Sequence, residues 1–195
     1  MVNKKQDPAM REKWDTHYQE APYEQAAKVL YDNQHLLPQQ GTALDLACGM
    51  GSNALLLAEA GLDTSAWEIS PIGVTRLNDE SKKRGLRIHT EVRDCIAHPP
   101  EPDQFDVIVV TRFLKREIFP NLINALKPKG LMFYQTFTQT KTDECGPDDP
   151  IFRLADNELR QLIKPLRLIV YREEGNLGDC NKGYRNFAMC VAQKI

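Results

Sequence analysis

Short apolar runs alternate with longer amphipathic stretches along most of this chain, and this alternation constrains the fold more than any other feature. Seven runs predict strands, at residues 42–47, 63–69, 87–92, 105–110, 131–137, 166–174 and 184–193. Helical patterns lie between most of them, at residues 51–61, 70–85, 115–130 and 155–165. Strands that alternate with helices are joined by parallel crossovers. We therefore predict an α/β fold: a three-layer, doubly wound, seven-stranded and mostly parallel sheet.

The last two predicted strands are connected differently. Only the loop GNLGDCNKG, residues 175–183, separates them, and it carries no helical pattern. A parallel pair needs a longer crossover, usually with a helix, whereas antiparallel neighbours need only a loop. We therefore predict that the last strand runs antiparallel and that the sheet ends in an antiparallel edge.

The chain of 195 residues fits one domain with a core of this size. Its first part reads as helical, beginning at Asp7 and Pro8 and stopping before Pro38. We predict that residues 1–38 form a helical lid or cap, and that residues 39–195 form the binding domain.

Composition excludes several classes of protein. Hydrophobic residues make up 42% and charged residues 27%, as in an ordinary globular domain, and the net charge of −2 gives no reason to expect a nucleic-acid partner. No apolar run approaches the roughly 18 residues that span a bilayer, and the start MVNKKQDPAM lacks the apolar core of a secretory signal. The five cysteines are scattered without zinc-type spacing, which predicts reduced thiols and no metal site. We expect a cytoplasmic protein without membrane association.

The stretch ALDLACGMGSNALLLA, residues 43–58, predicts a nucleotide site. Gly49, Gly51 and Ala54 have the spacing of a dinucleotide-binding turn between a strand and a helix, and Glu68 follows nineteen residues after Gly49, where a carboxylate accepts from ribose hydroxyls. Glycines there permit positive φ and let a ligand approach the backbone. The spacing alone is compatible with NAD.

Three features favour S-adenosylmethionine over NAD. Asp45, four residues before Gly49, would repel a pyrophosphate but suits the ammonium group of a methionyl moiety. Asp94 follows the third predicted strand, where a carboxylate can accept from the exocyclic amine of adenine. The antiparallel end of the sheet is unusual for dinucleotide-binding folds. We therefore predict S-adenosylmethionine as the cofactor.

These motifs resemble a known family. The segments KWDTHYQE, LDLACGMGSNALLLAEAG, WEISPIGVTRL, LKPKGLMFYQTF and NELRQLI occur in the same order in Rossmann-like (class I) S-adenosylmethionine-dependent methyltransferases, and the chain is particularly similar to their tellurite-resistance-type small-molecule branch. Two positions depart from the pattern: Glu68 stands where Asp is frequent, and Lys129 lies in a turn that is commonly Pro-Gly-Gly. Either carboxylate can hold two ribose hydroxyls, and the second change affects only the turn.

The resemblance implies a seven-stranded sheet with the last strand inserted antiparallel. It also implies that Asp45, with the backbone from Leu46 and Ala47 to Gly51, contacts the methionyl end of the cofactor. The remaining implied cofactor contacts are Glu68 and Ile69 at the ribose and adenine, Asp94 and Cys95 at the adenine, and Thr111 near the sulfonium.

The N-terminal segment offers an aromatic pair. Trp14 and Tyr18 are four residues apart, so they share one face of a helix, and aromatic faces attract a sulfonium cation. We hypothesise that this helix closes over the cofactor and presents both rings to it; the alternative is that the rings only pack the helix on the domain. His17, between them, is either a base or a solvent-exposed side chain.

Methyl transfer from a sulfonium is an in-line displacement, in which the protein mainly orients the reactants and excludes water. We therefore identify no catalytic acid or base. Arg112, just after the strand FDVIVVT, is the first candidate for binding an anionic acceptor, and Arg185, at the start of the last strand, is the second. The alternative for Arg112 is a structural pair with an acid of the 143–149 loop.

The predicted function is methyl transfer from S-adenosylmethionine to a small-molecule acceptor, such as an oxyanion or a thiol. A protein or other macromolecular acceptor is one alternative, although TRFL stands where base-modifying enzymes carry an N-P-P-Y or D-P-P-Y motif. A regulatory protein that binds S-adenosylmethionine without catalysis is another. The sequence leaves the acceptor and the oligomeric state open.

Overall fold

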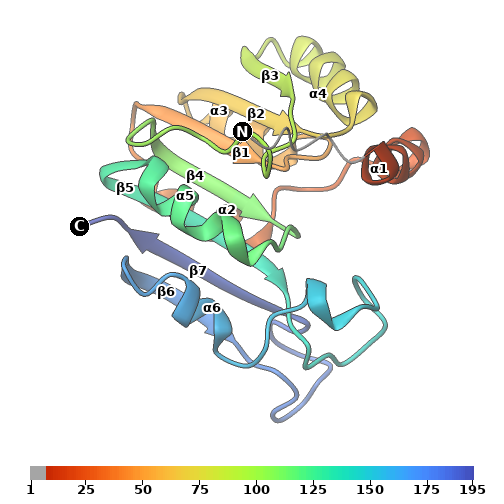
Figure 1. Ribbon diagram of the computed structural model, residues 1–195, viewed down its shortest axis with the longest axis vertical. Coiled ribbons are helices and arrows are strands. Elements are labelled where there is room, and N and C mark those ends of the chain that lie inside the picture. Colours follow the sequence, from red (N-terminus) through yellow and green to blue (C-terminus); the bar gives the residue numbers. More distant parts are fainter. Residues whose placement is uncertain (1–7) are drawn as a thin grey trace.

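The computed structural model describes residues 8–195 and contains one seven-stranded sheet in the order β3-β2-β1-β4-β5-β7-β6 (Figure 1). The strands are β1 Thr42–Leu46, β2 Asp63–Glu68, β3 Ile88–Val92, β4 Phe105–Thr111, β5 Leu126–Phe137, β6 Arg167–Glu173 and β7 Phe187–Gln193. Strands β1 to β5 pair in parallel, whereas β7 pairs antiparallel with both β5 and β6. The predicted sheet, with an antiparallel last strand, is confirmed.

The antiparallel strand lies inside the sheet, between β5 and β6, and β6 forms the edge. The inserted position implied by the family resemblance is therefore correct, and the antiparallel pairing of β7 with the edge strand β6 confirms the predicted antiparallel end of the sheet. Every residue of β7 from Ala188 to Ala192 is buried. A continuous apolar strand of this kind is stable where it has a pairing partner on each side and a covered surface above and below.

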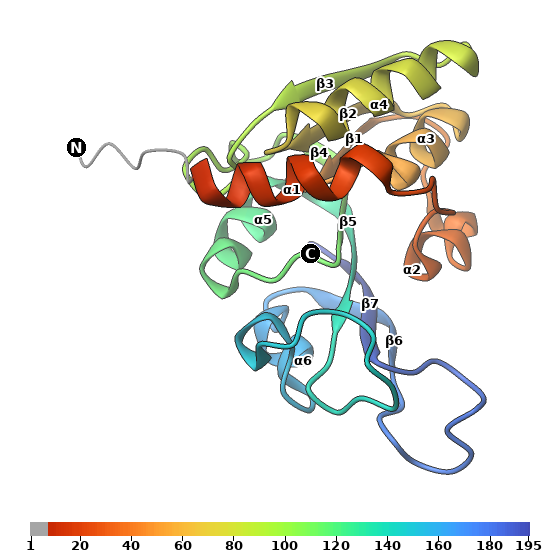
Figure 2. The ribbon, with the colours of Figure 1, turned by 90° about the vertical axis from the view of Figure 1, so that its right-hand side faces the viewer.

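Helices cover both faces of the sheet (Figure 2). They are α1 Pro8–Glu20, α2 Lys28–Tyr31, α3 Ser52–Glu59, α4 Pro71–Lys83, α5 Phe119–Ala125 and α6 Glu158–Leu162. The side chains of α2 and α3 join those of Ala43, Val107 and Val109 in one core cluster. The side chains of α5 and α6 join Leu44, Leu46 and Ile108 in the other. Because side chains alternate along β1 and β4, the two clusters lie on opposite faces of the sheet, as a three-layer fold requires.

The first helix lies across the ends of the strands rather than against a face of the sheet. Figure 2 shows α1 in front of the carboxyl ends of the parallel strands, next to α4. None of its described residues is buried, in contrast to those of α3 and α5. The predicted cap at the start of the chain therefore has a structural counterpart in α1, while residues 1–7 of that prediction lie outside the described part.

The prediction that the chain is helical up to Pro38 was largely wrong for the residues after α1. Residues 21–27, which we call the strap, are not helical, and only α2 and a short 3₁₀ turn at Gln34–Leu36 follow. The first residue of the strap, Ala21, precedes Pro22, and a proline disfavours helical backbone in the residue before it. Its last amide, of Ala27, donates to the side chain of Asn53, and the amide of Val29 donates to that of Gln135. Side chains of α3 and β5 thus bind backbone amides at the end of the strap and in the first turn of α2.

The helix expected over residues 115–130 is shorter than predicted. A 3₁₀ turn, Arg116–Ile118, leads into α5, with Pro120 in its first turn, where the missing amide is not needed. Strand β5 already begins at Leu126, which pairs with Phe105 of β4. Lys129 adopts a positive φ of 66° and bonds to Lys194 of the chain end, so the turn is part of the sheet rather than of the helix.

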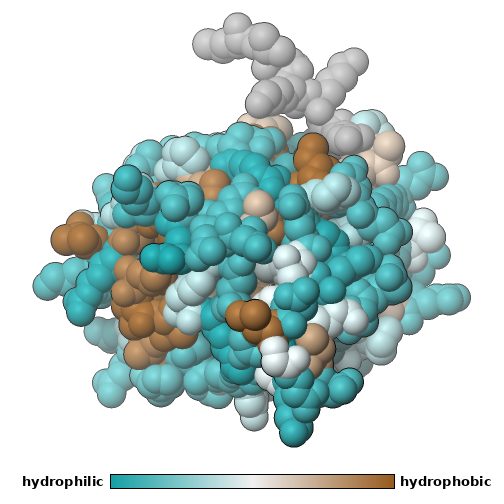
Figure 3. All heavy atoms as spheres, turned by 90° about the horizontal axis from the view of Figure 1, so that it is seen from below, coloured by the Kyte–Doolittle hydropathy of each residue, from teal (hydrophilic) through white to brown (hydrophobic). Residues whose placement is uncertain are grey.

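The free edge of the sheet exposes apolar side chains. Leu168 and Ile169 of β6 are about 40% exposed, and brown side chains gather on this side of an otherwise hydrophilic surface (Figure 3). The pairing of β6 with β7 shifts register between Leu168 and Val170, and Arg167 begins the strand. A bulge and a charge both discourage pairing with a further strand. Within residues 8–195, no helix combines the length and apolar character needed to span a bilayer.

Candidate functional site

The turn between β1 and α3 has the conformation that its glycines allow. Gly49 and Gly51 have φ values of 57° and 78°, and Ala47 shares the left-handed region at 55°. A Cβ on Gly51 would lie 2.3 Å from Leu77 Cδ1, and one on Gly49 would lie 2.9 Å from the hydroxyl of Tyr18. Glycine is therefore required at both positions by backbone angle and by close contact. The turn, residues 47–51, joins the end of β1 to the start of α3, and its backbone at Gly49 lies against Tyr18.

Asp45 lies at the end of β1, beneath this turn, and is 1% exposed. Its Oδ2 accepts a 3.0 Å hydrogen bond from the amide of Ala54, and its Oδ1 accepts a 3.4 Å bond from Asn53. Burial raises the pKa of Asp45 to about 7, and these two bonds partly oppose the rise. A buried cation beside this group would therefore favour its ionised form. Leu46 follows it, with its side chain in the core and only its backbone toward the turn.

Glu68 ends β2, the neighbour of β1, and is 3% exposed. Its carboxylate accepts a 2.8 Å bond from the amide of Gly49 and a 3.1 Å bond from that of Ser70. Burial raises the pKa of Glu68 above its ordinary value. Asp45 pairs with Ala66 of β2 and Glu68 follows Ala66 by two residues, so side-chain alternation places the two carboxylates on the same face of the sheet. Ile69 follows Glu68 and is partly exposed.

The loop after β3 adjoins these residues. The amide of Arg93 donates to the carbonyl of Glu68, which brings Asp94 and Cys95 next to the end of β2. Asp94 is partly exposed, and its Oδ1 accepts bonds from the amides of Ile96 and Ala97, at 2.9 and 3.1 Å. Burial raises the pKa of the Cys95 thiol to about 12, so this side chain is an apolar wall rather than a nucleophile.

Trp14 and Tyr18 share one face of α1, as their spacing predicts, and the Tyr18 ring lies against the turn. Tyr18 stacks on Trp14 with ring centroids 5.5 Å apart and planes inclined by 21°. A Cβ on Gly73 of α4 would lie 3.1 Å from Tyr18 Cδ2, so the tyrosine ring rests on both Gly49 and Gly73. Burial, with Glu68 nearby, raises the pKa of Tyr18. His17 is exposed and contacts both rings at their edges.

Polar contacts join α1 to α4. The Asp15 carboxylate accepts from the Ser70 hydroxyl and, at 3.4 Å, from the amide of Ile72, at the start of α4. In return, Arg76 Nη1 of α4 donates to the carbonyls of Tyr18 and Ala21, 2.7 and 2.6 Å away, where α1 ends. Each helix therefore satisfies free backbone groups at an end of the other. This is how a helix without buried residues is held over the site.

Thr111 and Arg112 lie at the end of β4. The Thr111 hydroxyl accepts a 3.0 Å bond from Asn53, which places it in the Asp45 network. Arg112 has a positive φ of 55°, and its guanidinium pairs with Glu24 of the strap. The partner suggested from sequence, an acid of the 143–149 loop, was wrong, because the strap passes directly over the strand end. Half of the Arg112 side chain remains exposed.

Arg185 is not brought into this group. Its guanidinium donates to the carbonyls of Lys182, Gly175 and Asp179, at 2.7, 2.9 and 3.0 Å, within the loop between β6 and β7. It also lies 3.8 Å from the Glu174 carboxylate. These contacts give Arg185 a structural role in its own loop, and we do not include it in the proposed acceptor site.

Sequence reasoning missed four polar residues of the site: Asp15, Glu24, Asn53 and Arg76. A signal existed for one of them. Asn53 is a polar residue in the apolar helix SNALLLA, and it is 5% exposed. A buried amide needs hydrogen-bond partners, so its position beside the turn pointed to a structural or binding role.

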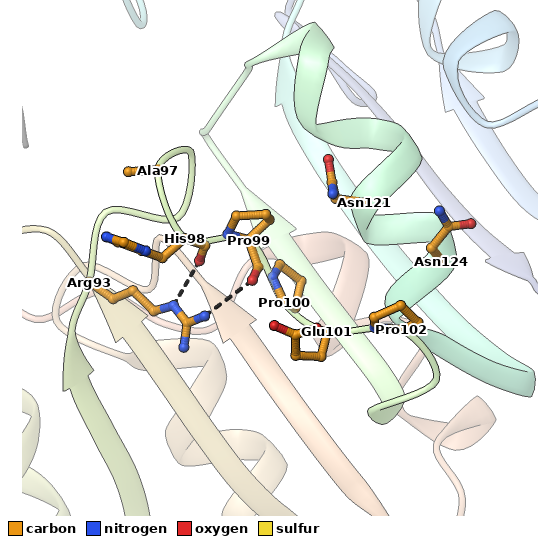
Figure 4. Close-up of a pocket in the computed structure, with 9 residues that line it drawn as sticks. All are labelled: Arg93, Ala97, His98, Pro99, Pro100, Glu101, Pro102, Asn121 and Asn124. Atoms are coloured by element: carbon orange, nitrogen blue, oxygen red, sulfur yellow. Dashed lines mark hydrogen bonds between the residues drawn. The ribbon is translucent and has the colours of Figure 1, made fainter. Parts of the chain in front are cut away.

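A separate cavity of about 330 Å³ lies between the proline-rich loop after β3 and α5 (Figure 4). Arg93 organises this loop by donating to the carbonyls of His98 and Pro99, at 2.8 and 3.1 Å, while it stacks over Trp67. Asn121 and Asn124 of α5 form the opposite wall. The cavity contains none of the predicted site residues, and within the described chain no cluster of three or more His, Cys, Asp or Glu side chains suits a metal ion.

Comparisons with known proteins agree with this geometry. Residues 7–189 match the family described as tellurite resistance protein TehB. A relative from Haemophilus influenzae, named "Probable S-adenosyl-L-methionine-dependent methyltransferase TehB", is 30% identical over 164 residues, which cover 77% of this chain and 56% of the relative. The chain therefore spans little more than half the length of that protein.

Solved structures show the same fold. The crystal structure of TehB from Haemophilus influenzae superposes with a TM-score of 0.71 at 26% identity, covering 95% of this chain and 67% of that one. A SAM-dependent methyltransferase from Aquifex aeolicus shares the fold at 16% identity, with a TM-score of 0.67 and 98% of this chain covered. The match over nearly the whole chain, together with the glycine turn between two buried carboxylates, shows that the chain belongs to the TehB family of Rossmann-like S-adenosylmethionine-dependent methyltransferases.

Proposed function

We propose that this protein transfers the methyl group of S-adenosylmethionine to a small-molecule acceptor by in-line displacement. The observation that carries the proposal is the arrangement of Asp45 and Glu68 around a turn that requires glycine at positions 49 and 51. Two buried carboxylates beside a turn whose backbone lacks side chains at Gly49 and Gly51 suit a ligand that offers an ammonium group and a sugar. A dinucleotide would instead place its pyrophosphate against Asp45.

Each part of the donor has a candidate partner. Asp45 would receive the methionyl ammonium, because the hydrogen bonds to its buried carboxylate from Asn53 and Ala54 both come from neutral donors. Glu68 would accept from the ribose hydroxyls with lone pairs that remain beyond its two amide bonds. Asp94, with Ile69 and Cys95 beside it, would hold the adenine.

The donor supplies an activated methyl group on a sulfonium, so the chain's own residues need to orient and to exclude water. The Tyr18 ring lies against the turn and stacks on Trp14 of α1, and an aromatic face contributes roughly 0.5–2 kcal/mol toward holding a cation. Thr111 lies at the end of β4, within the Asp45 network. Alignment of the reacting groups can lower the barrier by about 7–11 kcal/mol in favourable systems. A site that works by alignment in this way does not need an acid–base triad.

Two features support a small, anionic acceptor. Helix α1 crosses in front of the ends of the central parallel strands (Figure 2), and the strap bonds to the start of α3, so both partly cover the proposed donor site. Arg112 stands at this end of the sheet with half of its side chain exposed, and its partner Glu24 is a carboxylate that an acceptor oxyanion or carboxylate could replace. The five cysteines are free thiols, which suits the reducing cytoplasm that we expect for this protein.

Calorimetry with S-adenosylmethionine and its demethylated product tests donor binding. We expect wild-type protein to bind both and Asp45→Asn to bind at least tenfold more weakly, while Asp103→Asn, an exposed acid at the opposite end of the sheet, binds as the wild type does. Product assays with a panel of thiols, oxyanions and phenols then test catalysis. Binding without turnover on the panel would favour a regulatory protein or a macromolecular acceptor, and preferential binding of NADH would overturn the proposal.

A further inference from the structure

We propose that Asn53 is a positioning residue of the donor site, whose side-chain amide sets Asp45 relative to Thr111 and ties both to the strap. This inference rests on the proposed function, because it assigns the two contacted residues to the donor. It adds a residue that the glycine motif does not include. Asn53 lies in the first turn of α3, two residues after Gly51.

The amide of Asn53 joins three separate parts of the chain. Its Nδ2 donates to Thr111 Oγ1 at 3.0 Å and to Asp45 Oδ1 at 3.4 Å, and its Oδ1 accepts from the Ala27 amide at 2.9 Å. These residues belong to β4, to β1 and to the strap. A buried side chain with its donor and its acceptor both used has one orientation, so it fixes the distance between its partners.

The two contacted residues would face different atoms of the donor. Asp45 lies where the ammonium group is expected, and Thr111 lies at the end of the adjacent strand, where the sulfonium is expected. A side chain that fixes these two residues relative to each other also fixes the orientation of the donor that they hold. The position of its methyl group relative to the acceptor is thereby fixed as well. Asn53 itself does not need to touch the donor for this effect.

The strap connects the same amide to the covering helix. Glu24 accepts a 2.7 Å bond from Ser52 through its carbonyl and pairs through its side chain with Arg112. Ala27 then bonds to Asn53, and two residues later Val29 bonds to the side chain of Gln135, at 2.8 Å. Two amide side chains therefore hold this part of the chain, Asn53 at the end of the strap and Gln135 at the start of α2, and of these two only Asn53 also contacts Asp45.

This difference makes Gln135 a matched control for a measurement on Asp45. Asp45 faces Glu68 from β2 and the Tyr18 hydroxyl from α1, with the Cys48 thiol in the turn, and none of these groups supplies a positive charge. The bonds from Asn53 and Ala54 are what favour its ionised form. Loss of the Asn53 amide should therefore make the carboxylate harder to ionise, whereas loss of the Gln135 amide should not.

The experiment measures the dissociation constant of S-adenosylmethionine against pH for the full chain. In the wild type we expect affinity to fall as pH decreases through a midpoint near 7. In Asn53→Ala the midpoint should move upward by about 0.5–1 pH unit, since a hydrogen bond to a charged group is worth about one pKa unit or slightly more, and this one is long. In Gln135→Ala the midpoint should stay at the wild-type value.

Asn53→Ser provides a second, milder variant if Asn53→Ala does not fold, because the serine hydroxyl partly satisfies the neighbouring groups. Exchange of the Ala27 amide with solvent tests the link to the strap: it should be faster in both Asn53 variants and slowed by the donor less than in the wild type. An unshifted midpoint in an Asn53 variant, with donor binding intact in the wild type, would overturn this inference alone. A wild-type chain that binds no donor at any pH would overturn the proposed function as well.

Discussion

The backbone amide of Gly49 donates a 2.8 Å hydrogen bond to Glu68 Oε2, which joins the turn after β1 to the end of β2. The bond orients one carboxylate oxygen toward the turn, and Ser70 orients the other from the start of α4. The proposed ribose acceptor is thus held by the same backbone that the rest of the donor would contact. Five predictions follow from this arrangement and from the contacts around it.

Glu68→Gln should weaken donor binding. The amide keeps one oxygen for the Gly49 bond but removes the charge and replaces one acceptor by a donor. We expect the dissociation constant to rise about tenfold, or about 1.4 kcal/mol. Calorimetry gives the number, and Glu101→Gln, an exposed acid of the proline-rich loop, is the control. Equal affinities in the wild type and Glu68→Gln would remove Glu68 from the donor site.

Gly73→Ala should destabilise the protein even though it lies in a helix. Alanine is favoured over glycine in helices by up to about 1 kcal/mol. Here, however, a Cβ would lie 2.9 Å from the Gly49 carbonyl and 3.1 Å from the Tyr18 ring. We expect the free energy of unfolding to fall by about 1–3 kcal/mol, measured by denaturant titration. Thr75→Ala, at an exposed position of the same helix, is the control. A stabilised Gly73→Ala protein would show that the neighbouring atoms move aside to accommodate the added methyl group.

Arg76→Met should release α1 from α4. The variant keeps the apolar stem but loses the donors to the Tyr18 and Ala21 carbonyls. Because α1 has no buried residues, we expect trypsin to cleave several-fold faster after Arg11 and Lys13. Arg84→Met on the same helix loses only exposed ion pairs and serves as the control. Unchanged cleavage would mean that the aromatic contacts alone hold α1.

Arg112 and Glu24 should affect anionic acceptors in opposite directions. Arg112→Met removes the guanidinium, so KM for an anionic acceptor should rise about tenfold, as expected for the loss of one charged hydrogen bond. Glu24→Gln removes the carboxylate that competes for Arg112, so the same KM should fall. Steady-state kinetics with one anionic and one neutral acceptor test this. A similar change of KM for both acceptors would contradict a charge-specific role.

The raised pKa of Asp45 predicts opposite pH trends for stability and for donor binding. Its pKa of about 7 in the folded state exceeds its ordinary value of 3.8, so the folded chain binds more protons between these values and the free energy of unfolding falls as pH rises from about 4 to about 7. The donor ammonium needs the ionised carboxylate. Its affinity should therefore rise with pH, by up to about tenfold per unit below 7, and then level off.

Calorimetry and denaturant titration from pH 5.5 to 8.5 measure both trends. Asp45→Asn should flatten the pH dependence of donor binding over this range, because it removes the titrating group. A wild-type affinity that does not change between pH 5.5 and 7 would show that Asp45 is already ionised in the free protein, or that it does not meet the ammonium group.

Local patterns in the sequence were sufficient for much of this protein. Apolar and alternating runs predicted the seven strands; β4 and β7 are continuous runs because a strand buried on both faces needs apolar residues throughout. The short loop before β7 predicted its antiparallel direction, and the glycine spacing predicted the turn at Gly49 and Gly51, whose position beside Glu68 the structure shows. The four-residue spacing of Trp14 and Tyr18 predicted their shared face. Each of these depends on contacts between near neighbours or on the geometry of a single element.

Only the tertiary structure decided the contacts between segments far apart in the chain. Asn53 accepts from the last amide of the strap and Gln135 from an amide of α2, and Arg112 pairs with Glu24 rather than with the 143–149 loop. Arg185 is drawn into its own loop, and Asp15 and Arg76 join α1 to α4. Hydrogen bonds and ion pairs of this kind form between whichever polar groups the packed sheet brings within about 3 Å, and no local pattern encodes that choice.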